Sequence, residues 1–125
     1  MVCHDERRKY RRFEIPGAKV KVKKPSAFFL MKKFSYHPVL NLSIGGIKIL
    51  FDRELGRGRV IQLYLIVPGE KSLEYHARII WTKPVPISGD VITSLDFLPF
   101  DENKEHNSTE AMNLLRRLYA RYTDR

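Results

Sequence analysis

The sequence predicts one mainly-β domain, a closed or nearly closed antiparallel barrel followed by an amphipathic helix. Three observations support this prediction. The chain has 125 residues, 43% hydrophobic and 30% charged, which suits a single domain with a packed core. Short β-rich stretches recur between turn residues about every 8–12 positions, a pattern typical of barrels. Near the C-terminus the apolar residues change to helical spacing.

The first predicted strand covers residues 18–24, between the breaks at Pro16 and Pro25. Apolar residues alternate with lysines along it, so one face is expected to be buried and the other cationic. Trp81, on a late strand, is expected to pack in the core or at the barrel mouth, with contact to a ligand or partner as the alternative. Further strands are predicted over residues 27–34, 36–44, 47–51, 60–67, 73–83 and 91–100.

The last predicted element is a helix over residues 110–122, with apolar side chains at i, i+3 and i+4 spacing. We expect this helix to close the barrel mouth, although it could also bind a partner or pair with a second copy. Asn107, three residues before Glu110, is expected to cap it. The chain is thereby divided into a flexible basic arm (1–15), a barrel (16–100) and a C-terminal helix that packs on the barrel (101–125).

The net charge of +9 is concentrated near the N-terminus, where residues 1–24 hold nine of the 23 Lys and Arg residues. Such a segment predicts an anionic partner, which could be a nucleotide, a nucleic acid or a membrane surface. The N-terminus is charged where a secretory signal would be apolar, and no apolar run reaches the roughly 18 residues of a membrane span. With Cys3 as the only cysteine, these features predict a cytoplasmic protein without a membrane span.

Motifs of common catalytic and metal sites are missing from the sequence. It contains no phosphate-binding glycine loop of the Walker type, no HExxH, no CxxC and no GxSxG pattern. The four histidines lack the spacing of metal ligands. We therefore expect no catalytic residues, no metal and no cofactor.

Four arginines of the basic arm are candidate ligand clamps: Arg7, Arg8, Arg11 and Arg12. Members four residues apart, either Arg8 with Arg12 or Arg7 with Arg11, can converge on one doubly charged ligand. Each guanidinium presents a planar fork of donors that matches two phosphate oxygens or the O6 and N7 edge of guanine. One charged hydrogen bond of this kind contributes roughly 1.5–3 kcal/mol.

A second group of candidate binding residues lies where a predicted strand turns back: Asn41, Ser43, Gly45 and Gly46. An Asn amide can read a base edge, and a Ser hydroxyl can reach a phosphate. Asn41 and Ser43 are two apart on the strand and are expected to share a face. The glycines permit a positive φ or the close approach of a ligand.

The two groups together resemble the two-part motif of the PilZ domain family. Arg8 and Arg12 match its RxxxR part, and Asn41, Ser43 and Gly46 match its [D/N]xSxxG part after 28 intervening residues. The resemblance covers essentially the whole chain. It implies a six-stranded antiparallel PilZ-like barrel with a C-terminal helix, which binds cyclic di-GMP on its outer surface.

The resemblance also implies what each motif does. The arm arginines would grip the phosphates and the Hoogsteen edge of guanine, with Arg8 and Arg12 as the main clamps and Arg7 or Arg11 assisting. In the second motif, Asn41 stands where Asp is commoner, and so it lacks the negative charge that favours the N–H donors of guanine.

In the second motif, Asn41 would bind a guanine edge and Ser43 would contact the ligand. Gly46, beside Gly45, would let the ligand approach the barrel surface closely, because it has no side chain. Ligand binding would create a new surface for an effector protein, such as a flagellar, pilus or exopolysaccharide component. No catalysis is implied.

Two other functions fit the same residues. The basic arm could track the phosphate backbone of RNA or single-stranded DNA, although nucleic acid is the less favoured partner. Alternatively, the chain could be a PilZ-like adaptor that has lost its ligand and acts only through protein contacts. Selectivity for the cyclic dinucleotide over oligonucleotides would separate these functions.

Overall fold

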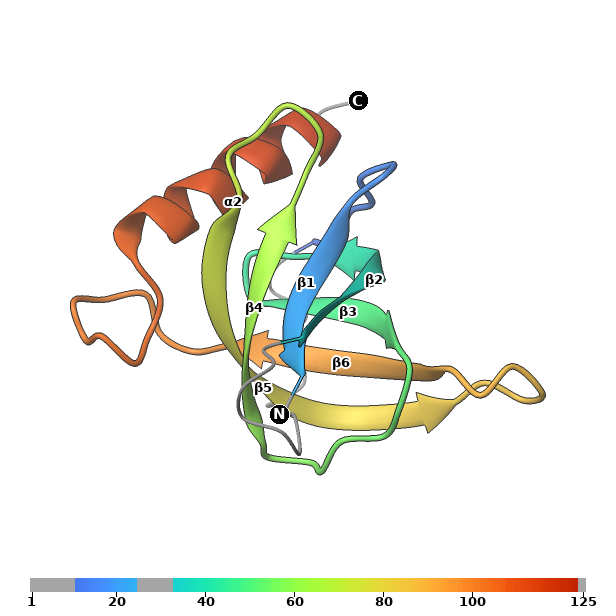
Figure 1. Cartoon of the computed structure of the whole chain (residues 1–125). Coiled ribbons are helices and arrows are strands. Elements are labelled where there is room, and N and C mark those ends of the chain that lie inside the picture. Colours follow the sequence, from blue (N-terminus) through green and yellow to red (C-terminus); the bar gives the residue numbers. More distant parts are fainter. Residues whose placement is uncertain (1–10, 25–32, 124–125) are drawn as a thin grey trace, which may run out of the picture.

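The strands of the protein close into a six-stranded antiparallel barrel, which confirms the predicted fold class (Figure 1). The computed structural model describes residues 11–24 and 33–123. Around the barrel the strands follow the order β1-β2-β3-β6-β5-β4, and α2 (Thr109–Thr123) packs beside β5. The strands are β1 (Lys19–Lys24), β2 (Lys33–Leu42), β3 (Gly46–Phe51), β4 (Val60–Ile66), β5 (Leu73–Pro84) and β6 (Val91–Phe97).

Over residues 33–42 the structure differs from the prediction of two separate strands, 27–34 and 36–44. Residues 33–34 and 36–42 belong to one strand, β2, because Ser35 lies in register opposite Val22 of β1 and continues the ladder. The prediction separated two strands at Ser35 because this residue is polar. In the structure the strand continues through Ser35 without a break. Of the strand predicted over residues 27–34, residues 27–32 lie outside the described residues.

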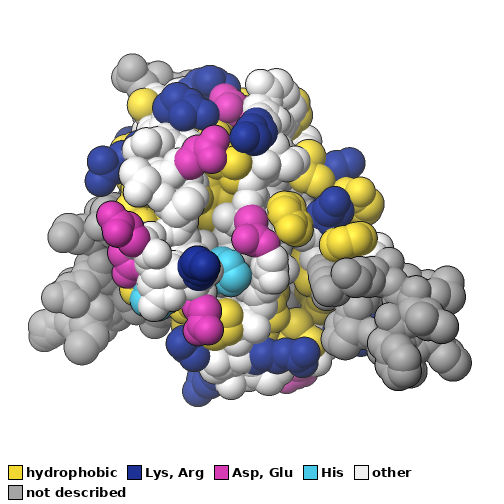
Figure 2. Space-filling view, turned by 60° about the vertical axis from the view of Figure 1, so that its left-hand side comes forward, with side chains coloured by type: hydrophobic (Ala, Val, Ile, Leu, Met, Phe, Trp, Pro, Cys, Tyr) yellow, Lys and Arg dark blue, Asp and Glu magenta, His cyan; other side chains and the backbone are white. Residues whose placement is uncertain are grey.

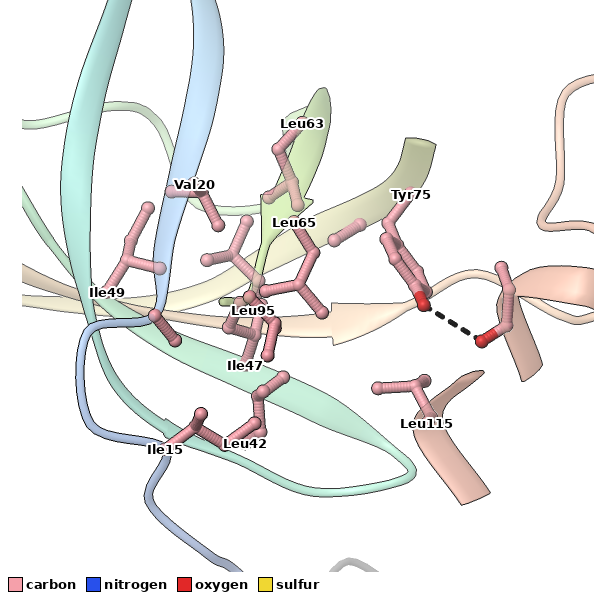
Figure 3. Packing of buried hydrophobic residues seen from close by; sticks show 14 of the residues in the cluster. Ile15, Val20, Leu42, Ile47, Ile49, Leu63, Leu65, Tyr75, Leu95 and Leu115 are labelled. Atoms are coloured by element: carbon pink, nitrogen blue, oxygen red, sulfur yellow. Dashed lines mark hydrogen bonds between the residues drawn. The ribbon is translucent and has the colours of Figure 1, made fainter. Parts of the chain in front are cut away.

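The core fills the barrel with the inward-facing residues of each strand (Figure 3). Along β1, Val20 and Val22 are buried and the intervening Lys21 is only partly so, as the alternation predicts. Buried apolar area contributes roughly 25 cal/mol per Å², so these side chains provide the main stabilisation of the barrel. Among the largest fully buried side chains are Val20, Ile47, Ile49, Leu63, Leu65, Tyr75, Ile79 and Leu95.

The helix α2 joins this core through its apolar face. Ala111, Leu114, Leu115 and Leu118 are all buried in the same cluster. The Tyr75 hydroxyl donates a hydrogen bond of 2.8 Å to the carbonyl of Ala111, drawn as a dashed line in Figure 3, and burial raises the pKa of this hydroxyl. No helix among the described residues has the length and hydrophobicity that a membrane span requires.

The cap of α2 is Ser108, so the expected role of Asn107 was wrong. The Ser108 hydroxyl accepts a hydrogen bond from the Ala111 amide at 3.0 Å, as an N-cap residue does. Asn107 is 1% exposed and instead bonds backbone groups of His76 and Leu98. A buried amide must use its donors and acceptor, and these two partners satisfy them. Asn107 therefore ties the segment before the helix to the barrel.

Candidate functional site

The root of the basic arm is hydrogen-bonded to the end of β2. The amide of Phe13 donates to the carbonyl of Leu42, and the amide of Leu42 donates to the carbonyl of Phe13, each at 2.8 Å. Next to this bridge, Arg12 Nη1 donates a hydrogen bond of 2.9 Å to Asn41 Oδ1. Two groups that are 29 residues apart in the sequence are therefore in contact on the exposed surface.

The other arginines of the arm are placed only in part. Arg11 is exposed beside Arg12, whereas Arg7 and Arg8 lie outside the described residues. The predicted arm extended to residue 15, and its last residues are packed: Phe13 and Ile15 are each 5% exposed within the core cluster. Because its neighbour Phe13 is buried in the core, the backbone of Arg12 is held at the barrel surface.

The turn between β2 and β3 is built around Ser43. Its hydroxyl oxygen accepts hydrogen bonds from the amides of Gly45 and Gly46, each at 3.1 Å, and its own amide donates to the carbonyl of Gly46 at 2.9 Å. Ser43 is 7% exposed. These bonds assign Ser43 a role in shaping the turn, which positions Asn41, while its contact with a ligand stays a prediction.

A bulge in β2 also contributes to the orientation of the site. The register between β2 and β3 shifts between Val39 and Asn41, and beyond the shift Asn41 lies opposite Lys48. Bulges bend a strand and redirect a side chain, and they are frequent next to functional sites. No local pattern in the sequence predicts this shift, because a bulge depends on how the neighbouring strands pair.

Gly46 lies too close to β6 to accept a larger side chain. A Cβ at this position would meet the carbonyl oxygen of Leu95 at 2.4 Å. We expect Gly46→Ala to lower the free energy of unfolding by about 1–3 kcal/mol, because the two strands must move apart. Urea denaturation measures this change.

Gly56→Ala is the matched control for Gly46→Ala. A Cβ at Gly56 would meet no atom of the described residues within 4 Å. We expect its free energy of unfolding to change by less than about 0.5 kcal/mol. Equal losses of stability in the two variants would contradict the proposed clash between β3 and β6.

Lys48 and Trp81 extend the surface away from Asn41. The sequence prediction missed Lys48 and gave a ligand or partner contact of Trp81 only as the alternative. Lys48 alternates with the buried Ile47 and Ile49 and so points outward. Its Nζ lies 5.2 Å from the ring centroid of Trp81, which is only partly buried and therefore not part of the fully buried core. The alternation of apolar and polar residues along β3 was enough to predict that Lys48 points outward. Its proximity to Trp81 could not be predicted, because the two residues lie on different strands.

The electrostatics of this surface favour an anion. Burial lowers the pKa of Lys48, and the nearby positive charge of Arg12 lowers it further. Two cations held close together repel each other, and a bound anion would relieve that repulsion. One carboxylate lies nearby, because Asp96 of β6 is exposed and stands in register opposite Gly46. The surface therefore combines cationic groups with the carboxylate of Asp96.

Arg12 also borders an open hollow of about 1200 Å³. It is formed by the arm root, the outer side of β2 and the end of α2, and it contains both polar and apolar groups. Residues on its wall include Arg11, Arg12, Lys19, Tyr36, Pro38 and Tyr122. Its size is ample for a ligand as large as a dinucleotide.

Comparison with known proteins gives one family and several related structures. A family model described as the PilZ domain matches residues 6–120 of this chain. Among curated proteins, none matches the sequence. The crystal structure of YcgR from Escherichia coli in complex with c-di-GMP aligns with a TM-score of 0.66 at 20% identity, over 90% of this chain and 44% of that chain.

Two further structures have the same fold. The PilZ domain of YcgR from Escherichia coli, with c-di-GMP, aligns with a TM-score of 0.67 at 18% identity, over 94% of this chain and 92% of that one. The inhibitor of motility MotI/DgrA from Bacillus subtilis aligns with a TM-score of 0.61 at 19% identity, over 90% of this chain and 49% of that one. This chain therefore spans less than half of the longer YcgR and MotI chains.

Proposed function

Because this chain belongs to the PilZ domain family, we propose that it is a receptor for cyclic di-GMP that binds the messenger on the outer surface of the barrel and catalyses no reaction. The observation that carries the proposal is the 2.9 Å hydrogen bond from Arg12 Nη1 to Asn41 Oδ1. This contact brings the basic arm to the glycine-containing turn on one exposed surface, where a doubly charged ligand can reach both.

In this proposal Arg12 is one of two principal clamps. The hydrogen bond to Asn41 uses one of the five N–H donors of a guanidinium, so other donors are available for phosphate oxygens or for the O6 and N7 edge of guanine. Arg8 is proposed as the second clamp, with Arg7 and Arg11 assisting. The alternative pairing, Arg7 with Arg11, would move the phosphate contacts away from Asn41.

The edge of one guanine is assigned to Asn41 and to Asp96. Asn41 lacks a negative charge, but the exposed carboxylate of Asp96 lies opposite Gly46 in the next strand. A carboxylate there would accept the N1–H and N2–H donors of guanine. If an Asp96→Asn variant binds cyclic di-GMP as tightly as the unaltered protein, the carboxylate of Asp96 is not part of the binding site.

Lys48 and Trp81 are proposed to complete the surface on the far side of Asn41. Lys48 provides a second positive charge near Arg12, and an anion between the two would offset their repulsion. The partly exposed ring of Trp81, next to Lys48, offers an apolar surface for a base. The ligand would then contact the arm, the turn and the outer face of β3 together.

The signal would pass from the arm to α2 and then to a protein partner. The Phe13 ring lies 5.9 Å from that of Tyr119 and 6.5 Å from that of Tyr122, both on α2. A ligand that fixes Arg12 also acts on Phe13 and hence on the end of the helix. We propose a cytoplasmic effector of flagellar, pilus or polysaccharide machinery as the recipient, with α2 as a possible contact between two copies.

Titration with cyclic di-GMP tests this function, and Trp81 reports it. Trp81 is the only tryptophan of the chain, so its fluorescence comes from the proposed site alone. We expect a saturable change of this fluorescence on addition of cyclic di-GMP and a raised melting temperature, because the ligand binds only the folded state. Calorimetry gives the affinity and the number of ligands bound.

Oligonucleotides serve as competitors in the same titration. A cyclic di-GMP receptor is expected to bind the messenger in the presence of excess single-stranded RNA or DNA. Displacement by these polymers, with a steep dependence on salt, would instead support the nucleic-acid function. No response to cyclic di-GMP at any concentration tested would support the adaptor that has lost its ligand.

A further inference from the structure

Aromatic rings flank the lysines of β1 on both sides: those of Phe34 and Tyr36 on β2 are exposed, and that of Tyr64 on β4 is partly buried. Tyr36 and Phe34 of β2 are 58% and 44% exposed, although both are large and at least partly apolar. Tyr64 of β4 lies on the other side of the strand. We call Lys19, Lys21, Phe34, Tyr36 and Tyr64 the lysine–aromatic strip. Hydrophobic and basic side chains lie next to one another on the upper part of the right-hand edge of Figure 2.

The lysines of the strip are held by the rings. Lys21 stands in register between Tyr36 and Tyr64, and its Nζ lies 4.6 Å from the ring centroid of Phe34 and 5.2 Å from that of Tyr64. Lys19 Nζ lies 5.2 Å from the ring centroid of Tyr36. Such cation–π contacts fix an ammonium group at the surface at low cost. The strip therefore presents a preorganised row of positive charge flanked by aromatic surface.

The strip has a defined border on the β5 side. The Tyr64 hydroxyl donates a hydrogen bond of 3.3 Å to Glu74, whose negative charge raises the pKa of Tyr64. Glu74 is in turn paired with His76 at 3.6 Å. The positive character thus ends at Glu74, and the surface changes there to mixed charge.

We propose that the lysine–aromatic strip is the docking surface for an acidic, extended segment of a protein partner. Exposed aromatic residues contribute nothing to the core and are enriched at protein interfaces. Two lysines at i and i+2 are about 7 Å apart along a strand, which is the spacing of carboxylates at i and i+2 of an extended segment. Charge complementarity then selects an acidic partner.

A nucleic acid fits the strip less well than an acidic peptide. Bases bind proteins by stacking on open ring faces. In the strip, one face of each of the rings of Phe34, Tyr36 and Tyr64 already has an ammonium group over it. A base could stack only on the opposite face of such a ring, whereas a carboxylate can pair with the ammonium group where it stands.

The strip is continuous with the proposed ligand site. Lys19 and Tyr36 line the open hollow that Arg11 and Arg12 also line. A ligand that fixes the arm would therefore change one border of the docking surface. The inference rests on the proposed function only for this coupling, since the strip itself is present without ligand.

Binding of a fluorescent acidic peptide tests the proposal. The probe is a short soluble peptide with glutamate at every second position and serine or leucine between, compared with single-stranded oligo-dT at low salt. We expect the full chain to bind the peptide more tightly than oligo-dT. Lys21→Glu and Tyr36→Ser are each expected to weaken peptide binding about tenfold or more.

Three controls separate the possible outcomes. Lys83→Glu changes an exposed lysine of β5 outside the strip and is expected to leave peptide affinity unchanged. Affinity for cyclic di-GMP, measured on Lys21→Glu, is expected to be retained, so that failure of the docking surface differs from failure of the ligand site. Melting temperatures check that each variant folds.

Several results would overturn the proposal. Absence of peptide binding, tighter binding of oligo-dT, or equal losses in Lys21→Glu and Lys83→Glu would each do so. A peptide affinity that Arg12→Ala abolishes and Lys21→Glu leaves unchanged would place the acidic segment on the arm instead of the strip.

Discussion

Replacing Arg12 with alanine is expected to weaken binding of cyclic di-GMP by about 10- to 150-fold while the domain stays folded. One charged hydrogen bond contributes roughly 1.5–3 kcal/mol, which converts to that range of dissociation constants. The exposed guanidinium contributes little to the core, so the melting temperature without ligand should change little. Calorimetric titration measures the affinity.

Arg8→Ala and Arg116→Ala complete the Arg12 experiment. Arg8, the other proposed clamp, should show a loss of the same order. Arg116 is an exposed arginine of α2 and carries the same charge, so its replacement controls for the lowered net charge and should leave affinity unchanged. Unchanged affinity in both Arg8→Ala and Arg12→Ala would refute the assigned clamps, and losses confined to Arg7 and Arg11 variants would favour the alternative pairing.

Replacing Phe13 with alanine is expected to lower the free energy of unfolding by about 3–5 kcal/mol, the usual cost of removing a buried phenylalanine. The side chain is 5% exposed and contacts the rings of Tyr119 and Tyr122. Its backbone also forms the bridge to Leu42 that places Arg12 beside Asn41. Affinity for cyclic di-GMP should therefore fall as well. Urea denaturation and calorimetric titration measure the two effects.

Phe34→Ala is the matched control for Phe13→Ala. It removes the same side chain from a position that is 44% exposed and should cost far less stability. Phe13→Leu should retain most of the buried apolar contact and most of the affinity. If Phe13→Ala cost less than about 1 kcal/mol, or left affinity unchanged, the arm root would not couple the ligand site to α2.

Much of the barrel could be predicted from the sequence because strand signals are local. Alternation along residues 18–24 gave the buried and exposed faces of β1, and turn residues bounded β3, β4 and β5 closely. The prediction failed at residues 33–42, where a polar residue within a continuous ladder was interpreted as a break. Local propensity is overridden there by pairing with β1.

Sequence alone determined the family resemblance, the two groups of candidate residues and the cationic face of β1, because each depends on residue type and spacing along the chain. Only the tertiary structure decided that Arg12 contacts Asn41, that Ser43 is committed to the turn, and that Lys48 and Trp81 lie beside each other. The Ser43 bonds are local to the turn, whereas the other two contacts join segments that are remote in sequence. Barrel closure, strand register and the bulge in β2 set such contacts, and no local pattern encodes them.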